Sequence, residues 1–327
     1  MQYSTLEGIR VPASRLVFGT GTRKVFGDDP DAAIECLDMV FEAGFTVFDS
    51  AHSYEHAEEN LGKWLVKRGC REKIILLDKG CNPGQHGMED TLSAQTILEQ
   101  FQMSLDRLQT DYIDLYILHR DDPTRPVGEI VETLNKLKEE GKILRFGGSN
   151  WTYQRILEAN AYAQAHGLTG FSVCSPQYSM VDYVSDPWGG SVSATGEAQA
   201  PFRQWLEETQ MPVFNYSSLG RGYLSGRYRT NQSEPIEKCL WWGPIQEYHR
   251  PENVKRLERA EKLAQIKGCT VPQIAVAWLC KQKVNLFPIL SPSSHTHIKE
   301  TVEALELPMT AEEAAWIING GIWENAE

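Results

Sequence analysis

Three apolar runs of the sequence each end at an ionisable residue. Asp49 ends "FTVFD", Lys79 follows "KIILLD", and His119 follows "IDLYIL", while Tyr54 lies shortly after the first run. A free tyrosine has a pKa of about 10, too high for efficient proton transfer near neutral pH, and we expect a neighbouring Lys79 cation to lower it. Asp49 would keep the lysine charged, and a neutral His119 could hydrogen-bond a substrate oxygen. Together the four residues could protonate an alkoxide as it forms.

Each of these residues also has a purely structural explanation. Asp49 or the nearby Ser53 could cap the next helix, Lys79 could form a rim ion pair, His119 could be a hydrogen-bonded strand-end residue, and Tyr54 could belong to the core. Three consecutive apolar runs that end in ionisable residues favour a shared site. That site forms only if the runs are parallel strands whose carboxyl ends meet.

The chain alternates between short apolar runs and longer amphipathic segments. The apolar runs, which are rich in β-branched and aromatic residues, occupy 15–19, 45–49, 73–78, 113–118, 143–149, 171–175, 211–217 and 285–290. Helices are predicted within 29–45, 92–110, 127–142, 152–167 and 271–282. Eight such alternations predict a (β/α)8 TIM barrel formed by residues 1–327 as a single domain. A doubly wound sheet is the alternative, but no GxGxxG fingerprint follows the first strand.

Two segments, 178–200 and 227–250, exceed ordinary loop length and carry Trp188, Trp241, Trp242 and Tyr248. Long loops in a compact domain are usually functional or disordered, and this aromatic content argues against disorder. In a barrel both would follow strands and lie on the C-terminal face, where such enzymes keep their sites. Their aromatic rings could stack on sugars or aromatic ketones.

Bulk composition excludes several classes of partner. The formal net charge is −12 without any Lys/Arg-rich run, so we expect neither nucleic acid nor an anionic membrane as a partner. No apolar stretch approaches the roughly 20 residues that span a bilayer, and the N-terminus does not resemble a signal peptide. The 7 cysteines are scattered without a CxxC pair, which suits reduced thiols in a cytoplasmic protein. The sequence does not determine the oligomeric state.

Several motifs in order resemble the aldo-keto reductase superfamily over nearly the whole length. "FDSAHSYEHAEENLG" is similar to its FDTAxxYGxxExxLG signature, and "DLYILHR", "GGSNW", "SPQYS" and "NYSSLGRGYLSGR" match four further motifs. The resemblance implies reduction of an aldehyde or ketone, with sugars and keto sugars among the candidates, by NADP(H) or NAD(H). Tyr54 would be the general acid, Lys79 paired with Asp49 would tune it, and His119 would orient the carbonyl. Asp78 stands where the family usually has Thr or Ser.

The resemblance also implies a cofactor site built without a Rossmann motif. The nicotinamide would lie under Tyr216, and its amide would be held by Ser149, Asn150 and Gln177. Gly19 and Thr20 would approach the cofactor from the first strand. The pyrophosphate would be covered by Ser217, Leu219, Gly220 and Arg221.

One stretch, "PILSPSSHTHIKET", departs from the family pattern PGxxxxxQLxxN. Ser291 replaces the glycine, Ser293 falls near the Lys or Arg that usually contacts the 2′-phosphate of NADPH, His297 replaces Gln and Thr301 replaces Asn. A hydroxyl discriminates little between a phosphate and a ribose hydroxyl. We therefore expect unusually good acceptance of NADH, with His295, His297 or Lys299 as alternative phosphate contacts.

Two other functions fit the same residues. A cofactor-binding regulatory subunit that senses redox state would share the fold, although the presence of all four catalytic residues disfavours it. A metal-dependent hydrolase could use His52 and His56, four residues apart, together with Glu59. No further cluster of ligand residues completes such a site, so no metal is predicted.

Overall fold

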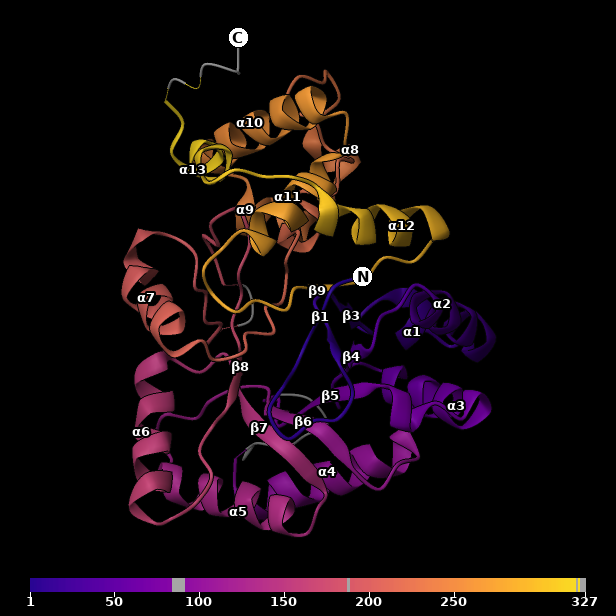
Figure 1. Cartoon of the computed structure of the whole chain (residues 1–327), viewed down its shortest axis with the longest axis vertical. Coiled ribbons are helices and arrows are strands. Elements are labelled where there is room, and N and C mark those ends of the chain that lie inside the picture. The colour runs from indigo at the N-terminus through magenta and orange to yellow at the C-terminus, as the bar shows by residue number, and fades with distance from the viewer. Residues whose placement is uncertain (84–91, 187–188, 322, 324–327) are drawn as a thin grey trace.

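The computed structural model describes residues 1–83, 92–186, 189–321 and 323. Within these residues the centre of the protein is a curled sheet of seven parallel strands in the order β8–β7–β6–β5–β4–β3–β9 (Figure 1). The strands are β3 (Val17–Gly19), β4 (Val47–Asp49), β5 (Ile75–Gly80), β6 (Ile113–Leu118), β7 (Ile143–Ser149), β8 (Val173–Ser175) and β9 (Ile289–Leu290). A short antiparallel pair, β1 (Tyr3–Ser4) and β2 (Ala13–Ser14), precedes them.

Alternate strand residues point to opposite faces of this sheet. Val17, Val47 and Leu77 belong to a small apolar cluster on the face that we call inner, whereas Phe18 and Phe48 belong to a larger cluster shared with the helices. The same alternation determines which face the polar side chains at the strand ends point to. Asp49 lies two residues after Val47, and Lys79 two residues after Leu77, so both reach the carboxyl end of the sheet on the inner face.

Helices pack against the other face of the sheet. They are α1 (Arg23–Phe26), α2 (Pro30–Glu42), α3 (Ala57–Arg68), α4 (Ala94–Leu108), α5 (Val127–Glu139) and α6 (Tyr153–Ala165), with the 3-10 turn η1 (Arg71–Lys73) before β5. Capping side chains fix several helix starts: Asp29 accepts from two backbone amides of α2, Ser93 from Thr96, and Thr152 from Arg155. The helices predicted from periodicity are confirmed in these places.

The apolar run at 211–217 forms isolated bridges instead of a strand. Val213 bridges both Cys174 and Leu286, and its amide donates to the carbonyl of Asn285 at 2.9 Å. Pro212 and Pro288 have no N–H to donate, which shortens the ladders on both sides. The expected eight-stranded barrel is therefore seen as seven strands joined through a bridged segment.

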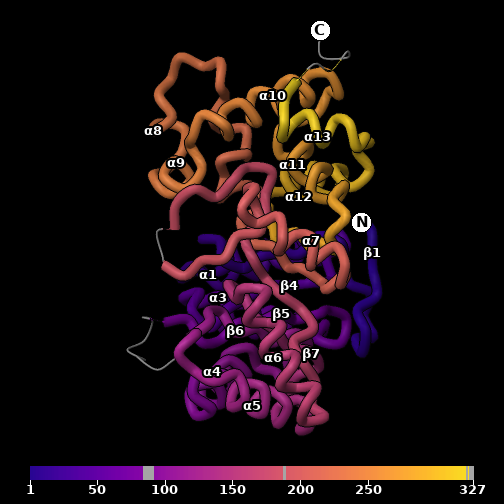
Figure 2. The backbone as a smooth tube through the Cα atoms, turned by 90° about the vertical axis from the view of Figure 1, so that its left-hand side faces the viewer, coloured from indigo at the N-terminus to yellow at the C-terminus, as the bar shows by residue number. Residues whose placement is uncertain are grey.

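The C-terminal third adds further helices, and Figure 2 shows α8 to α13 gathered at the end away from α4 and α5, whereas α7 lies nearer the sheet. They are α7 (Ala200–Thr209), α8 (Ile236–Cys239), α9 (Trp242–Tyr248), α10 (Pro251–Lys267), α11 (Val271–Cys280), α12 (His295–Glu303) and α13 (Ala311–Asn319), with the 3-10 turns η2 (Glu197–Gln199), η3 (Gly220–Gly222) and η4 (Ala304–Glu306). The segment 227–250, predicted as a loop, thus contains α8 and α9. Trp188, noted in the other long segment, lies outside the described residues.

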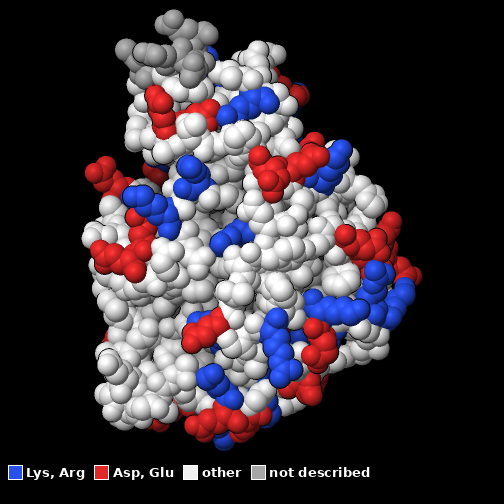
Figure 3. All heavy atoms as spheres, in the orientation of Figure 1, with Lys and Arg blue, Asp and Glu red and all other residues white. Residues whose placement is uncertain are grey.

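The surface carries both signs of charge. Figure 3 shows acidic and basic side chains intermixed on the face that it draws. Among the described residues, no helix combines the length and the apolar character needed to cross a bilayer.

Candidate active site

The structure brings the four predicted catalytic residues together at the carboxyl end of the sheet. Lys79 Nζ donates to the Asp49 carboxylate and, at 2.8 Å, to the carbonyl oxygen of Ser50. The same ammonium lies 5.1 Å from the centre of the Tyr54 ring. The Tyr54 and His119 rings meet edge to face with 5.9 Å between their centroids. Two of these side chains come from strands β4 and β5, and the other two come from the turns that follow β4 and β6. All four lie close together at the carboxyl end of the sheet.

Backbone hydrogen bonds continue the sheet into these turns. The amide of Ser50 donates to the carbonyl of Leu77, that of His52 to Lys79, and that of His119 to Gly80, each within 2.7–2.8 Å. The Tyr54 amide closes a turn onto the carbonyl of Ala51 at 2.9 Å. Neither Asp49 nor Ser53 caps α3, whose N-cap residue is His56. Asp49 instead binds Lys79, so the capping interpretation is wrong.

Burial governs the electrostatics of this cluster. Burial would lower the pKa of Lys79, but the adjacent Asp49 carboxylate and then Tyr54 outweigh it and raise that pKa, so the lysine stays a cation. Burial raises the pKa of Tyr54 above its ordinary value, and the Lys79 charge offsets only part of this. The sequence-based expectation of a lowered tyrosine pKa is thus wrong for the protein without cofactor. Tyr54 is held as a protonated phenol.

His119 is a neutral imidazole in this site. Burial lowers its pKa well below the ordinary value, and the charges of Lys79 and Arg120 act in the same direction. Ser53 Oγ lies 3.5 Å from His119 Nδ1. A neutral ring can donate one hydrogen bond to a substrate oxygen, in agreement with the role expected from the sequence.

Asp78 points to the opposite face from Lys79 and lies among buried polar groups. Its side chain is 0% exposed, and that of its neighbour Glu58 is 1% exposed. Burial raises the pKa of Asp78 well above its usual value, and the Glu58 charge adds to this. Glu58 in turn accepts from Arg107 at 2.9 Å. This shift favours the protonated form of Asp78, which lies behind Lys79.

The two histidines considered as metal ligands lie apart. His52 is buried beside Arg107, whose Nη1 lies 3.3 Å from His52 Nδ1, whereas His56 is exposed and pairs with Asp28 and Glu59. Both residues precede α3, so they do not share the helix face that the hydrolase alternative would need. Among the described residues, no group of three His, Cys, Asp or Glu side chains could hold a metal ion.

Among the residues expected around the nicotinamide amide, Ser149, Asn150 and Tyr216 are linked by side-chain hydrogen bonds, and Gln177 pairs with Tyr216 through the backbone. Asn150 Nδ2 donates to the His119 carbonyl at 3.1 Å, and Tyr216 Oη donates to Asn150 Oδ1 at 2.7 Å. Ser149 Oγ donates to the carbonyl of Ser175 at 2.9 Å, and Gln177 Oε1 accepts from Ser193 at 2.7 Å. The cluster joins β7, β8 and the bridged segment directly beside His119.

The first strand meets the last at its carboxyl end. Ser291 Oγ donates to the Gly19 carbonyl at 2.8 Å, and Thr20 Oγ1 donates to Ser50 Oγ at 3.0 Å. A Cβ on Gly19 would lie only 2.8 Å from an Ile289 methyl group. A Cβ on Gly21 would meet the Tyr54 ring at 3.4 Å. Gly21 was not among the predicted residues, although it lies one position beyond Thr20.

The segment 217–222 is a tight turn with several left-handed residues. Ser217, Gly220, Arg221 and Gly222 have φ values of 53°, 57°, 53° and 101°. Such turns direct successive amide groups to one side and suit an anion. Leu219 precedes η3. The Arg221 guanidinium forms an ion pair with the buried Glu247, and its Cζ lies 4.4 Å from the centre of the Trp241 ring. Contacts at α9 and its N-cap residue therefore hold this side chain in place.

The start of α12 contains the residues that depart from the family pattern. Ser293 is partly buried and His297 is exposed, and Thr301 lies further along the same helix. Lys24 Nζ, from α1, donates to the Ser293 carbonyl at 2.7 Å. A cation is thus present beside Ser293, although the sequence around Ser293 lacks one. Lys299 pairs instead with Glu303 at 3.7 Å.

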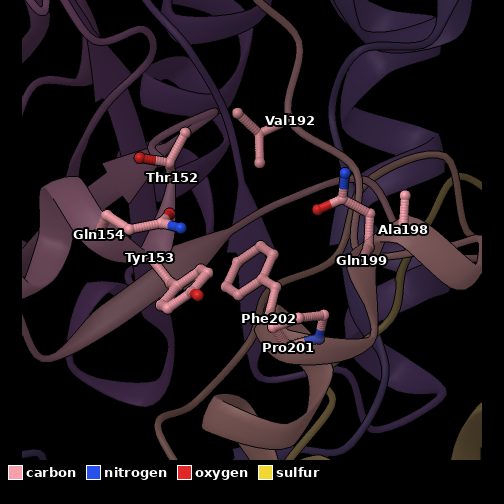
Figure 4. Close-up of a pocket in the computed structure, with 8 residues that line it drawn as sticks. All are labelled: Thr152, Tyr153, Gln154, Val192, Ala198, Gln199, Pro201 and Phe202. Carbon is pink, nitrogen blue, oxygen red and sulfur yellow. The ribbon is translucent and has the colours of Figure 1, made fainter.

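A separate hollow of about 270 Å³ lies between the starts of α6 and α7. Figure 4 shows Tyr153 and Phe202 side by side within it, with Val192 and Gln199 opposite. It contains none of the four clustered catalytic candidates. In its wall, Val192 donates its amide to Asn150 Oδ1 at 3.0 Å.

The sequence matches the Aldo/keto reductase family over residues 15–318. Norsolorinic acid reductase A of Aspergillus parasiticus is 30% identical over 94% of this chain and 76% of its own length. The norsolorinic acid reductase of Aspergillus flavus is 30% identical over 95% of this chain and 78% of its own length. An aldo-keto reductase of Strobilurus tenacellus is 29% identical over 88% of this chain and 80% of its own length. With the motifs in order and the strand-end cluster in place, this chain belongs to the aldo/keto reductase family.

Proposed function

We propose that this protein reduces an aldehyde or ketone with NADPH or NADH, and that Tyr54 is the general acid. The observation that supports this most directly is the convergence of Asp49, Tyr54, Lys79 and His119 at one strand edge. Membership of the family supports an oxidoreductase.

The residues around the site fit a dinucleotide. Tyr216 offers an aromatic surface beside the amide and hydroxyl groups of Ser149, Asn150 and Gln177. The left-handed turn at 217–222 offers backbone amides for a pyrophosphate. Lys24, beside Ser293, offers a charge for a further phosphate. When bound, the nicotinamide cofactor would supply the hydride.

The protein's own residues would handle the proton. His119, as a neutral donor, would hydrogen-bond the carbonyl oxygen and hold it near the Tyr54 hydroxyl. The phenol would then donate its proton as charge develops on that oxygen. Lys79 would stabilise the resulting phenolate, and Asp49 would hold the ammonium in place. Tyr54 is only partly buried, so water could return the proton to the phenolate.

We also infer that the segment 211–217 is the remaining strand of a closed (β/α)8 barrel formed by residues 1–327. Its support is the pair of bridges from Val213 to Cys174 and Leu286, together with the bond from the Ile289 amide to the Asn215 carbonyl at 3.0 Å.

The substrate class shifts from the one considered first. Three similar proteins are named for norsolorinic acid, and a fourth is named only as an aldo-keto reductase. We therefore rank other carbonyl compounds ahead of keto sugars. The test follows consumption of each reduced cofactor with a panel of aryl aldehydes, ketones and keto sugars. Cofactor binding without turnover of any carbonyl compound would overturn the proposal in favour of a regulatory subunit.

A further inference from the structure

Arg120 is a partly buried cation next to the catalytic histidine. It follows His119 directly, just beyond β6, and its Nη1 donates to Ser191 Oγ at 3.1 Å. Ser191 adjoins Val192, whose amide binds the same Asn150 oxygen that accepts from Tyr216. The Arg120 charge also acts on both the His119 and the Tyr216 ring. The guanidinium therefore lies at the rim that holds the reacting groups.

Its acidic neighbours in the chain are bound elsewhere. Asp121 pairs with Arg155 at 3.2 Å, and Asp122 pairs with Arg125 at 3.7 Å. Asp186 contacts Ser191 as well: it accepts from the Ser191 amide at 2.7 Å and from the Tyr183 hydroxyl at 3.2 Å. Across residues 1–83, 92–186, 189–321 and 323, no carboxylate forms an ion pair with Arg120.

A partly buried guanidinium without a carboxylate partner is unusual in a chain with a net charge of −12. Desolvating a cation is costly unless an anion compensates it. A guanidinium also presents parallel N–H donors that match two oxygens of one anionic group. A single hydroxyl partner, Ser191, leaves most of these donors available.

We propose that Arg120 binds an anionic oxygen group on the carbonyl substrate, so that the preferred substrates are aldehydes or ketones that carry a carboxylate or an ionised phenol. The inference rests on the proposed function, since it assigns the substrate class of that same site. Arg120 would determine specificity, whereas Tyr54 and His119 would act on the carbonyl whatever the substituent.

The test compares matched substrates. The 2-, 3- and 4-carboxybenzaldehydes are assayed against their methyl esters, and hydroxybenzaldehydes against methoxybenzaldehydes at a pH that ionises the phenol. We expect the wild type to favour a charged member over its neutral partner in kcat/KM by at least about tenfold. Loss of one charge-assisted contact corresponds to about 10- to 150-fold, so Arg120→Gln should reduce the ratio by that factor. The carboxylate and phenol pairs separate the two sources of the anion.

Two further variants separate charge from structure. Arg120→Lys keeps the charge without the paired donors and should retain part of the ratio. Ser191→Ala removes the hydroxyl that holds Arg120 and should keep the preference for the charged substrate. If Arg120→Gln lowers kcat/KM equally for charged and neutral substrates, the role of Arg120 is structural and the inference is overturned. A wild type with a higher kcat/KM for the neutral substrates would also overturn it.

A binding measurement distinguishes this inference from the proposed function. Benzoate and benzamide are titrated into cofactor-saturated protein by tryptophan fluorescence. Tighter binding of benzoate that Arg120→Gln abolishes supports the anion site even if no carbonyl is turned over, in which case the proposed function fails alone. Turnover of carbonyls without any preference for charged substrates or for benzoate overturns the anion site alone.

Discussion

Replacing Lys24 by Gln should weaken NADPH binding and leave NADH binding unchanged. Lys24 Nζ lies 2.7 Å from the Ser293 carbonyl, at the start of α12, and its side chain is exposed. A phosphate monoester carries about −1.5 to −2 charges at neutral pH. Two unit charges about 4 Å apart in water attract by about 1 kcal/mol. The exposed contact is therefore worth roughly 1.5–2 kcal/mol, or about 10- to 30-fold in affinity.

The assay titrates NADPH and NADH into each variant and follows tryptophan quenching. Lys24→Arg serves as the charge-preserving control, and Ser293→Arg tests whether a second cation raises the NADPH/NADH affinity ratio. The wild-type preference for NADPH should stay below about 100-fold and should shrink as salt is added, because exposed charges are screened. An equal loss of both cofactors in Lys24→Gln would place the lysine on the pyrophosphate, and an unchanged ratio in both Lys24→Gln and Ser293→Arg would refute the reasoning.

Three other predictions concern the strand-end cluster. Tyr54→Phe should lower carbonyl reduction by about 10²- to 10⁴-fold with cofactor affinity nearly unchanged; near wild-type turnover of an unactivated ketone would remove Tyr54 as the acid. Lys79→Met should lower kcat and move the alkaline limb of the pH–rate profile upward, because burial then raises the pKa of Tyr54 without opposition; an unmoved limb would make Lys79 purely structural. The free energy of unfolding of Asp78→Asn, relative to that of the wild type, should increase as pH rises above about 4. The folded pKa of Asp78 is raised, so the stability that its protonated form contributes at low pH is lost as pH rises, with a slope of up to about 1.4 kcal/mol per pH unit. Chemical denaturation from pH 4 to 8 measures this, and a pH-independent difference between the two proteins would contradict it.

The clustering of the four candidate catalytic residues could be predicted from the sequence, because the geometry of a strand is set by local alternation. Alternation fixes the face of Asp49 and Lys79 once Val47 and Leu77 are placed in a buried strand, and parallel pairing brings the strand ends together. The order of the motifs then identified the family. The raised pKa of Tyr54 was not accessible, since it depends on how completely packing removes water from the phenol.

Contacts between distant parts of the chain were also missed. Lys24 and Ser293 are 269 positions apart, and the ion pair of Arg221 with Glu247 depends on where α9 folds back. No periodic pattern encodes either contact. The run at 211–217 had the composition of a strand, but its pairing depends on neighbours that contain proline, so composition alone predicted too regular a ladder.

The bridged segment has a consequence for the dynamics of the protein. Along most of the sheet, adjacent strands pair in regular ladders, but β8 and β9 are joined through residues 212–216, which bond to both sides and form only isolated bridges. Local opening should require the least free energy at this seam, and amide hydrogen exchange should be fastest there. Tyr216 lies three residues after Val213, and its hydroxyl donates to Asn150, which directly follows β7. A ligand that contacts both Tyr216 and Asn150 should therefore stabilise this seam. Its binding should slow amide hydrogen exchange along the carboxyl end of the sheet.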